Sequence, residues 1–345
     1  SVGDDIDGDI RPFGAAPALG ADEIRCLARL NGVYYDTVQA AVDASASSSD
    51  IIQVAGTCQG VQSRDGTVQL AYISKTLTVR GGYSGDFSAW NPQAYPTTLD
   101  AQQQGRVIRI AGTIAGSITP TLEALYLTNG SINNWGGGIL SRFASTVISG
   151  CQVYGNTGNQ LGGGIYLDAG PNARLIGNRV YSNSVTGNGS GGGLYVAFSG
   201  GITLMNDEFR SNVAGYGGGV FLNNSDSTLA NNIFADNQVS SRGSGLDLYN
   251  SSLDLLHSTF ARNTGGDGSG ICARASGGNH STVTLTNTIL VGHSVGITVS
   301  TGCTATLSAT LWGSGAWANG QPWGGSGAVF TGTDIYGDPA FADPD

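Results

Sequence analysis

The sequence Gly136-Gly137-Gly138-Ile139 is the best guide to the architecture, because motifs of the same kind return five more times along the chain. The later copies are Gly162-Gly163-Gly164-Ile165, Gly191-Gly192-Gly193-Leu194, Gly217-Gly218-Gly219-Val220, Gly243-Ser244-Gly245-Leu246 and Gly268-Ser269-Gly270-Ile271. The copies begin at residues 136, 162, 191, 217, 243 and 268, so successive starts differ by 26, 29, 26, 26 and 25 residues. Self-similarity at such a period predicts a stacked repeat fold.

A second motif keeps phase with the glycines: a large apolar residue, two variable positions and an asparagine. Its copies are Val153-Tyr154-Gly155-Asn156, Val180-Tyr181-Ser182-Asn183, Phe209-Arg210-Ser211-Asn212, Phe234-Ala235-Asp236-Asn237 and Phe260-Ala261-Arg262-Asn263. The five asparagines are expected to stack at one turn as an amide ladder. Leu290-Val291-Gly292-His293 is a weaker copy, so His293 is interpreted as a turn residue in the same position.

The segments between these motifs predict short strands. Ile165-Tyr166-Leu167 and Val283-Thr284-Leu285-Thr286 are rich in β-branched and aliphatic residues, and Gly, Asn and Ser bound them. A coil of about 26 residues with three such strands would place each strand about 4.8 Å above its copy. The sequence therefore predicts an all-β fold: a single-stranded, right-handed parallel β-helix of roughly ten to twelve coils.

The chain divides into three predicted zones. Residues 1–25 are Asp-rich and then Pro/Gly/Ala-rich, which is typical of an extended connector. Residues 26–50 are expected to form an N-terminal cap with a short helix beginning at Asp36, where Asp36 and Gln39 have the spacing of a capping box. Residues 51–345 are assigned to the β-helix. A helix at its start would cover the open end of the apolar core.

Composition limits the partners. The 345 residues carry a formal net charge of -10, which argues against binding to nucleic acid because such binding needs a basic patch. No apolar run approaches the length of a membrane span, so no membrane insertion is expected.

The five cysteines lack the close spacing of a metal or redox motif. Cys26 and Cys58 flank the predicted cap helix, and a disulfide between them would fasten the cap. Cys272 and Cys303 are 31 residues apart, near one coil, and are predicted to form a second disulfide across adjacent turns. Cys151 is interpreted as a small buried residue.

Several stretches resemble known families. Residues 35–43 (YDTVQAAVD) with residues 50–54 (DIIQV) resemble the N-terminal cap of pectate-lyase-like β-helix proteins. The Gly-Gly-Gly-[Ile/Leu/Val] and Phe-x-x-Asn motifs resemble the repeats of chlamydial polymorphic outer-membrane proteins, where the third motif residue is usually Ala. Residues 77–87 and 96–100 are similar to large secreted bacterial repeat proteins of that kind. The resemblance implies a β-helix and a secreted or cell-surface, bacterial-type setting, and it supplies no catalytic residues.

The order of the two ends is unusual for this resemblance. A segment like residues 337–345 (GDPAFADPD) usually closes such a β-helix, and a segment like Asp5 to Glu23 commonly follows it, but here the second segment stands first. The resemblance thus implies one unit of a tandem array, or a module whose front connector belongs to a preceding module. We expect head-to-tail self-association in which residues 1–25 contact a neighbouring copy. Within that segment, Asp4, Asp5, Asp7 and Asp9 are candidate calcium ligands, although the downstream Glu of a complete EF-hand loop is lacking. No other cofactor is expected.

Candidate catalytic chemistry is sparse, and no catalytic residue is assigned. Asp207, Glu208 and Asp236 occupy variable positions around the turns and are interpreted as solvated surface rather than as an acid–base pair. A non-catalytic structural or adhesive module is therefore predicted, with a polysaccharide-binding module or a polysaccharide lyase or hydrolase as the alternative. A glycan is a candidate ligand. The aromatic candidates for it are Trp312, Trp317 and Trp323, which are interpreted first as a plug for the C-terminal end of the helix.

Overall fold

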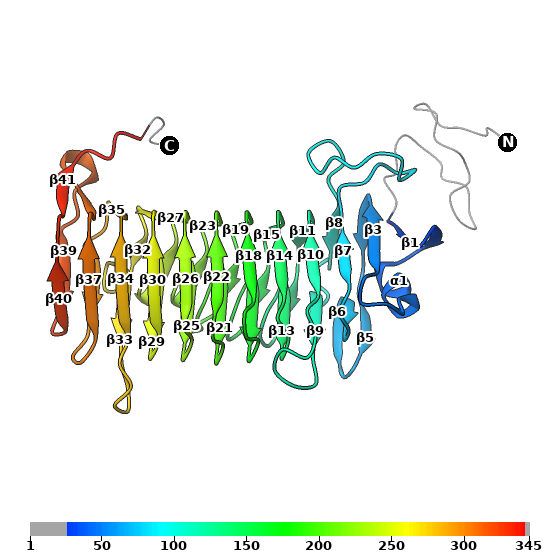
Figure 1. Ribbon diagram of the computed structural model, residues 1–345, viewed down its shortest axis with the longest axis horizontal. Coiled ribbons are helices and arrows are strands. Elements are labelled where there is room, and N and C mark those ends of the chain that lie inside the picture. Colours follow the sequence, from blue (N-terminus) through cyan, green and yellow to red (C-terminus); the bar gives the residue numbers. More distant parts are fainter. Residues whose placement is uncertain (1–25, 342–345) are drawn as a thin grey trace.

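The computed structural model describes residues 26–341, and the predicted right-handed parallel β-helix is confirmed. Strands of successive coils lie side by side along the long axis, with α1 (Val38–Ala44) at the N-terminal end and the last coil at the other (Figure 1). The strands form four sheets, whose members are given in the next two paragraphs. In each coil the chain passes from sheet 4 to sheet 1, then to sheet 2, and in six coils also to a short sheet 3. The sequence predicted three strands per coil, so the short sheet 3 was not predicted.

The four sheets are defined by their strands. Sheet 1 contains β2 (Val33–Tyr35), β1 (Leu27–Leu30), β3 (Ile51–Ala55), β7 (Thr78–Arg80), β10 (Thr121–Glu123), β14 (Val147–Ser149), β18 (Arg174–Ile176), β22 (Ile202–Met205), β26 (Ser227–Ala230), β30 (Ser252–Leu256), β34 (Thr282–Thr286), β37 (Thr304–Ser308) and β40 (Ala328–Thr331). Sheet 2 contains β4 (Thr57–Gln59), β8 (Thr98–Asp100), β11 (Tyr126–Thr128), β15 (Gln152–Tyr154), β19 (Arg179–Tyr181), β23 (Glu208–Arg210), β27 (Ile233–Ala235), β31 (Thr259–Ala261), β35 (Ile289–Val291), β38 (Leu311–Gly313) and β41 (Ile335–Gly337).

Sheet 3 contains β12 (Ser131–Ile132), β16 (Thr157–Gly158), β20 (Ser184–Val185), β24 (Val213–Tyr216), β28 (Gln238–Arg242) and β32 (Thr264–Gly265). Sheet 4 contains β5 (Gln62–Arg64), β6 (Thr67–Ile73), β9 (Arg106–Ala111), β13 (Ile139–Arg142), β17 (Ile165–Asp168), β21 (Leu194–Ala197), β25 (Val220–Asn223), β29 (Leu246–Tyr249), β33 (Ser269–Arg274), β36 (Val295–Val299) and β39 (Gln321–Gly325). A 3₁₀ turn, η1 (Gly315–Trp317), lies in the last coil.

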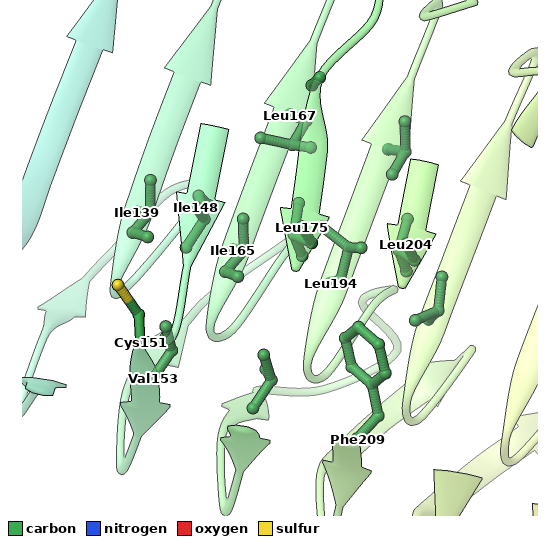
Figure 2. Packing of buried hydrophobic residues seen from close by; sticks show 14 of the residues in the cluster. Ile139, Ile148, Cys151, Val153, Ile165, Leu167, Leu175, Leu194, Leu204 and Phe209 are labelled. Atoms are coloured by element: carbon green, nitrogen blue, oxygen red, sulfur yellow. The ribbon is translucent and has the colours of Figure 1, made fainter. Parts of the chain in front are cut away.

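The core is built from like residues stacked on like. Figure 2 shows inward side chains of sheets 4, 1 and 2 meeting between the strands, for example those of Ile139, Ile148 and Val153. In sheet 2, the rings of Phe209, Phe234 and Phe260 stack with centroids 5.2 and 4.4 Å apart, and all three are fully buried. Because adjacent coils present the same residue at the same height, each side chain fills the space beside its copy.

The asparagines of the second motif form a continuous buried ladder. In Asn183, the backbone N–H and the side-chain Nδ2 both donate to Oδ1 of Asn212 in the next coil, at 3.0 and 3.1 Å. The same Nδ2 donates its second hydrogen to the carbonyl oxygen of Val153, at 2.8 Å. Every side-chain hydrogen-bonding group is thereby used, as burial requires. The pattern runs through Asn156, Asn183, Asn212, Asn237 and Asn263.

The glycine motif is explained by close backbone contact between coils. A Cβ at Gly164 would lie 2.7 Å from the carbonyl oxygen of Gly193, and Gly162 has a left-handed φ of +64°. The short contact at Gly164 and the positive φ at Gly162 each disfavour a residue that carries a Cβ.

The N-terminal cap differs in detail from the prediction. The helix begins at Val38, so its N-cap is Thr37, whose hydroxyl accepts a hydrogen bond from Ala40 N–H at 3.1 Å. Asp36 is therefore not the cap, and Gln39 makes no capping box. Gln39 is buried and instead bonds the backbone N–H and carbonyl of Tyr72 in the first coil. Within residues 26–341, no helix is long and apolar enough to cross a membrane.

Candidate functional site

The outward face of sheet 2 carries a groove that we call the charged groove. It crosses three consecutive coils, on β15, β19 and β23, and has a cavity volume of about 210 Å³. Val153, Val180 and Phe209 point into the core at the centre of these strands. Their sequence neighbours therefore point outward, because side chains alternate along a strand. The groove is lined by Gln152, Arg179, Tyr181, Ser182, Glu208, Arg210 and Ser211.

Glu208 lies between two arginines of the charged groove. Arg179 Nε is 3.4 Å from Glu208 Oε2, and Arg210 Nη1 is 4.0 Å from Glu208 Oε1. Both contacts are long for an ion pair, since charge-assisted N–H···O bonds usually span about 2.7–2.9 Å. The Arg179 side chain is 66% exposed, so solvent also weakens its attraction to Glu208.

The row of charges continues past the groove along the rod. Arg210 Nε is 3.3 Å from Asp236 Oδ2, and Arg262 Nε is 2.8 Å from Asp236 Oδ1. Burial by itself would raise the pKa of Asp236, but the hydrogen bond and charge of Arg262, together with Arg210, outweigh it and lower that pKa. Along sheet 2 the order of charges is thus Arg179, Glu208, Arg210, Asp236 and Arg262.

Neutral hydrogen-bonding groups stand beside these charges. The rings of Tyr154 and Tyr181 stack in parallel, with centroids 5.0 Å apart. The hydroxyl of Tyr181 donates to Gln152 Oε1 at 3.1 Å. Ser182 and Ser211 add hydroxyls at the edge of the groove. The charged groove therefore offers amide, hydroxyl and guanidinium groups in successive coils, a combination suited to a polar, extended ligand.

The outward face of sheet 4 is different, because its aromatic side chains are buried against one another. The rings of Trp135, Tyr166, Tyr195 and Phe221 stack at centroid distances of 5.3, 5.4 and 5.0 Å. Tyr166, Tyr195 and Phe221 are each about 5% exposed or less. Their ring faces are taken up by neighbouring rings, so this ladder stabilises the rod and leaves little face for stacking on a sugar.

The aromatic ladder ends at a buried ion pair. Arg274 Nε donates to Asp247 Oδ1 at 2.8 Å, and Asp247 is fully buried. Burial raises the pKa of Asp247 to about 7, although the charge of Arg274 opposes that shift. The Arg274 guanidinium also lies over the rings of Tyr216, Phe221 and Tyr249 at 4.8–5.3 Å. These contacts fix Arg274 within the protein.

The predicted disulfides have different outcomes. Cys26 and Cys58 are joined, which ties the start of β1 to β4. The prediction of a bond between Cys272 and Cys303 is wrong, because both are free thiols. Cys303 packs in the core, whereas Cys272 lies in the outward row of sheet 4 opposite Asp247, so a wall of the rod separates them. Cys151 is buried in the core.

The three candidate tryptophans have different positions. Trp312 is 1% exposed and packs in the core, so it cannot bind a glycan and that part of the prediction is wrong. Trp323, in the last coil, lies 6.0 Å from Trp312 between ring centroids. Trp317 contacts Phe341 edge-on at 5.0 Å and the guanidinium of Arg262 at 5.5 Å. These contacts fit the first interpretation, in which the tryptophans close the C-terminal end of the helix.

Asp207 does not lie on the solvated surface that the sequence indicated. It is 1% exposed and belongs to a second ladder, between Asn178 and Asn232. The charged groove is visible in the sequence as Arg179-Val180-Tyr181 and Glu208-Phe209-Arg210, in which polar or charged residues flank an inward apolar residue. Which of these charges meet depends on the register between coils.

The candidate calcium ligands Asp4, Asp5, Asp7 and Asp9 lie outside the described residues, so calcium binding stays a prediction. Within residues 26–341, no three histidine, cysteine, aspartate or glutamate side chains gather as a metal-binding group.

A family model described as the right-handed β-helix region matches residues 117–234 and 183–310. The chain belongs to the right-handed β-helix family. A search of curated proteins found no match.

Solved β-helix structures resemble this one at low sequence identity. The periplasmic alginate epimerase AlgG is 13% identical, with 84% of this chain and 85% of that chain covered and a TM-score of 0.39. The A-module of the Azotobacter vinelandii mannuronan C-5 epimerase AlgE4 is 13% identical, with coverages of 87% and 91% and a TM-score of 0.37. The endo-xylogalacturonan hydrolase of Aspergillus tubingensis is 13% identical, with coverages of 81% and 87% and a TM-score of 0.28. These likenesses concern the β-helix architecture.

Proposed function

We propose that this β-helix is a rigid, non-catalytic module that binds an extended polysaccharide along the outward face of sheet 2. The observation that carries the proposal is the charged groove, in which one amide, three hydroxyl groups and two guanidinium groups are spread over three consecutive coils. A shallow groove that follows a rod suits a polymer better than a small molecule, since small-molecule sites are usually deep enough to bury most of the ligand.

A secreted or cell-surface setting belongs to the same proposal. The disulfide between Cys26 and Cys58 supports it, because structural disulfides persist mainly in oxidising compartments. Polysaccharides are abundant outside cells, so the proposed ligand and the proposed location agree.

The test is a binding screen of the whole chain against acidic and neutral polysaccharides, with double-stranded DNA as a polyanion of another class. We expect binding to at least one polysaccharide and none to DNA, because the net charge of -10 opposes it. Tyr181→Ala together with Gln152→Ala, two changes within the groove, should weaken binding. Failure to bind any polysaccharide, or an unchanged affinity in the double variant, would contradict the proposal.

Cleavage of the polymer is the competing function. Each polysaccharide that binds is incubated with the protein, and shortened chains or newly formed unsaturated ends are measured. We expect the polymer to keep its length and composition. Product formation that scales with protein concentration would replace the proposal with a polysaccharide lyase or hydrolase.

Head-to-tail association through residues 1–25 is a second proposal, and the last coil supports it. β39, β40 and β41 are each the final strand of their sheet among the described residues, and an exposed strand edge is a template for pairing with another chain. Exposed apolar side chains accompany these edges at Trp323, Phe330, Ile335 and Tyr336. Light scattering at rising concentration should show growing particles for residues 1–345 and a constant mass for residues 26–345. A constant mass for both would remove the proposal.

A further inference from the structure

The two ends of sheet 1 carry an inference about how copies of this chain meet, and it rests on the head-to-tail association proposed above. We infer that β40 of one copy pairs in parallel with β2 of the next copy, so that sheet 1 continues from one rod into the following one. Within residues 26–341, β2 and β40 are the outermost strands of sheet 1. β1, the neighbour of β2, lies at one end of the rod, and β40 lies at the other (Figure 1).

The first argument is strand direction. β1 runs antiparallel to both β2 and β3, and these two reversals make β2 parallel to β3. Every pair from β3 to β40 is parallel. A second copy that follows along the axis in the same orientation therefore presents β2 to β40 as a parallel strand. Sheet 4 cannot continue in this way, because its first strand, β5, is antiparallel to β6.

The second argument is the shape of the N-terminal end. β1 and β2 extend sheet 1 by two strands beyond β3, which is about 10 Å. α1 packs against β1, β2 and β3 and covers the core beside them. A helix is about 10 Å across, so α1 and the two added strands reach a similar height. The last coil of another copy can then rest on both at once.

The third argument is the alternation of side chains. In β2 and in the last three residues of β40, the first and third residues lie on the core side, because they pair with buried core residues of the adjacent strand. The middle residue of each strand faces outward. The matched pairs are Val33 with Val329, Tyr34 with Phe330, and Tyr35 with Thr331. A shift by one residue would place core-side residues opposite outward ones, so the alternation sets the register.

The fourth argument is the exposure of apolar side chains on these two strands. Val33, Tyr34 and Phe330 are 55%, 53% and 60% exposed. Pairing of β2 with β40 covers all three, which the hydrophobic effect favours. It also places the ring of Tyr34 beside that of Phe330. Tyr195 and Phe221 have this arrangement within the rod, where their rings stack 5.0 Å apart on adjacent strands.

The size of the contact indicates how it works with residues 1–25. Stable protein interfaces bury roughly 1,200–2,000 Å², which is more than a pair of three-residue strands provides. Residues 1–25 precede Cys26 and join the rod at this same end, beside β1. The strand pair therefore aligns the two copies, while residues 1–25 supply much of the remaining contact. Because the same contact can repeat at each free end, the assembly is open and grows into filaments.

The experiment joins Tyr34 and Phe330 across copies of the whole chain. A tagged Tyr34→Cys variant is mixed with an untagged Phe330→Cys variant under mild oxidation. Adjacent parallel strands are about 4.8 Å apart, which is within the Cα–Cα range of a disulfide. We expect a linked dimer that contains both variants. With Phe198→Cys in place of Phe330→Cys, a change at a 65% exposed position far from both ends, cross-linking should be about 10-fold weaker, because only paired positions have a high effective concentration.

Each outcome of the cross-linking bears on a different proposal. Equal cross-linking by the Phe198→Cys control, or linkage of Phe330→Cys mainly to itself, would overturn the inference. If light scattering shows association but no mixed dimer forms, the strand pairing is wrong and the head-to-tail proposal stands. A constant mass of the whole chain at rising concentration would remove both.

Charge changes test the register without cysteines. Tyr34→Asp combined with Phe330→Lys places opposite charges across the proposed strand pair, whereas Tyr34→Lys combined with Phe330→Lys places like charges there. Circular dichroism checks that both variants fold. We expect the like-charge variant to need about 10-fold higher concentration to associate by light scattering, because like charges directly opposite each other repel. Equal association of the two variants would overturn the inferred register.

Discussion

Asp207 is a carboxylate in a stack of amides, and this determines how its protonation affects the fold. Asp207 Oδ1 accepts hydrogen bonds from the backbone N–H and the Nδ2 of Asn178, both at 2.8 Å. Its own N–H donates to Asn232 Oδ1, also at 2.8 Å. Burial raises its pKa to about 7, above the ordinary value of 3.8. The folded state therefore keeps the proton longer than the unfolded state, and stability falls as the pH rises from about 4 to about 7.

We predict that Asp207→Asn stabilises the protein at pH 8 by about 1–3 kcal/mol, because the change removes the desolvation cost of the buried carboxylate. At pH 4 the gain should be close to zero, because Asp207 is then protonated and resembles an amide. Urea unfolding at the two pH values measures the difference. Asp254→Asn makes the same change at an exposed position and is the control. An equal gain at both pH values would contradict the assigned role.

His293 continues the first ladder in place of an asparagine. Its Nε2 lies 3.2 Å from Asn263 Nδ2, and its Nδ1 lies 3.3 Å from Asn319 Oδ1. Because Asn263 Nδ2 can only donate, Nε2 must accept, so the ring is neutral with its hydrogen on Nδ1. Burial lowers the pKa of His293 to about 4. The unfolded chain binds a proton on this histidine at a higher pH than the folded chain does. The free energy of unfolding therefore decreases as the pH falls from about 6.5 to about 4.

Replacing His293 by Asn should remove this loss. We expect the melting temperature of His293→Asn, followed by circular dichroism, to decrease less than that of wild type when the pH is lowered from 6.5 to 4. His257→Asn, an exposed change at another turn, should behave like wild type. Parallel pH dependence in all three proteins would show that His293 does not titrate as described.

At the scale of elements, the strands of sheet 2 depend on the stacked phenylalanines. Phe234 is packed between Phe209 and Phe260 and is fully buried, whereas its neighbour Ile233 is 47% exposed. We predict that Phe234→Ala lowers the free energy of unfolding by about 3–5 kcal/mol, because it leaves a cavity in the middle of the stack. Ile233→Ala should cost less than about 1 kcal/mol. Denaturant unfolding measures both, and similar costs would contradict the inward register of β27.

The cysteines at the N-terminal end are in a different chemical state from those in the later coils. Cys26 and Cys58 are bonded, while Cys151, Cys272 and Cys303 are buried thiols. Burial raises the pKa of each thiol, so little reactive thiolate forms in the folded protein. A thiol reagent should therefore find almost no reactive group in native protein and three groups after unfolding without reductant. Detection of one thiol after unfolding would show that Cys272 and Cys303 are bonded. Detection of five thiols would show that Cys26 and Cys58 are not bonded.

At the scale of the whole molecule, a rod made of coils that contact only their neighbours should tolerate changes at its two ends differently. The N-terminal cap covers apolar core with Val38, Ala41 and Val42 of α1. We predict that removal of residues 26–50 together with the preceding segment causes aggregation. Removal of residues 315–345 should uncover Trp312 and shorten the rod by one coil, while the preceding coils stay folded because each coil packs only on its neighbours. Size-exclusion chromatography measures both, and a monomeric, folded protein without the cap would contradict this prediction.

The sequence determined the architecture through repetition. Glycine at one corner and asparagine at another recur at nearly constant spacing, and each has a local reason: close backbone contact at Gly164 and full hydrogen bonding at Asn183. Such reasons act within one coil and its copy, so a one-dimensional pattern was enough to predict a right-handed β-helix.

Which outward side chains meet could be learned from the folded structure alone. The burial of Asp207, the sharing of Glu208 between two arginines and the separation of Cys272 from Cys303 all depend on register and on which side of a strand each residue faces. Coils of unequal length place these residues at intervals that the motif does not fix. The period of the chain thus determined the rod, whereas the alignment of neighbouring coils determined the chemistry on its surface.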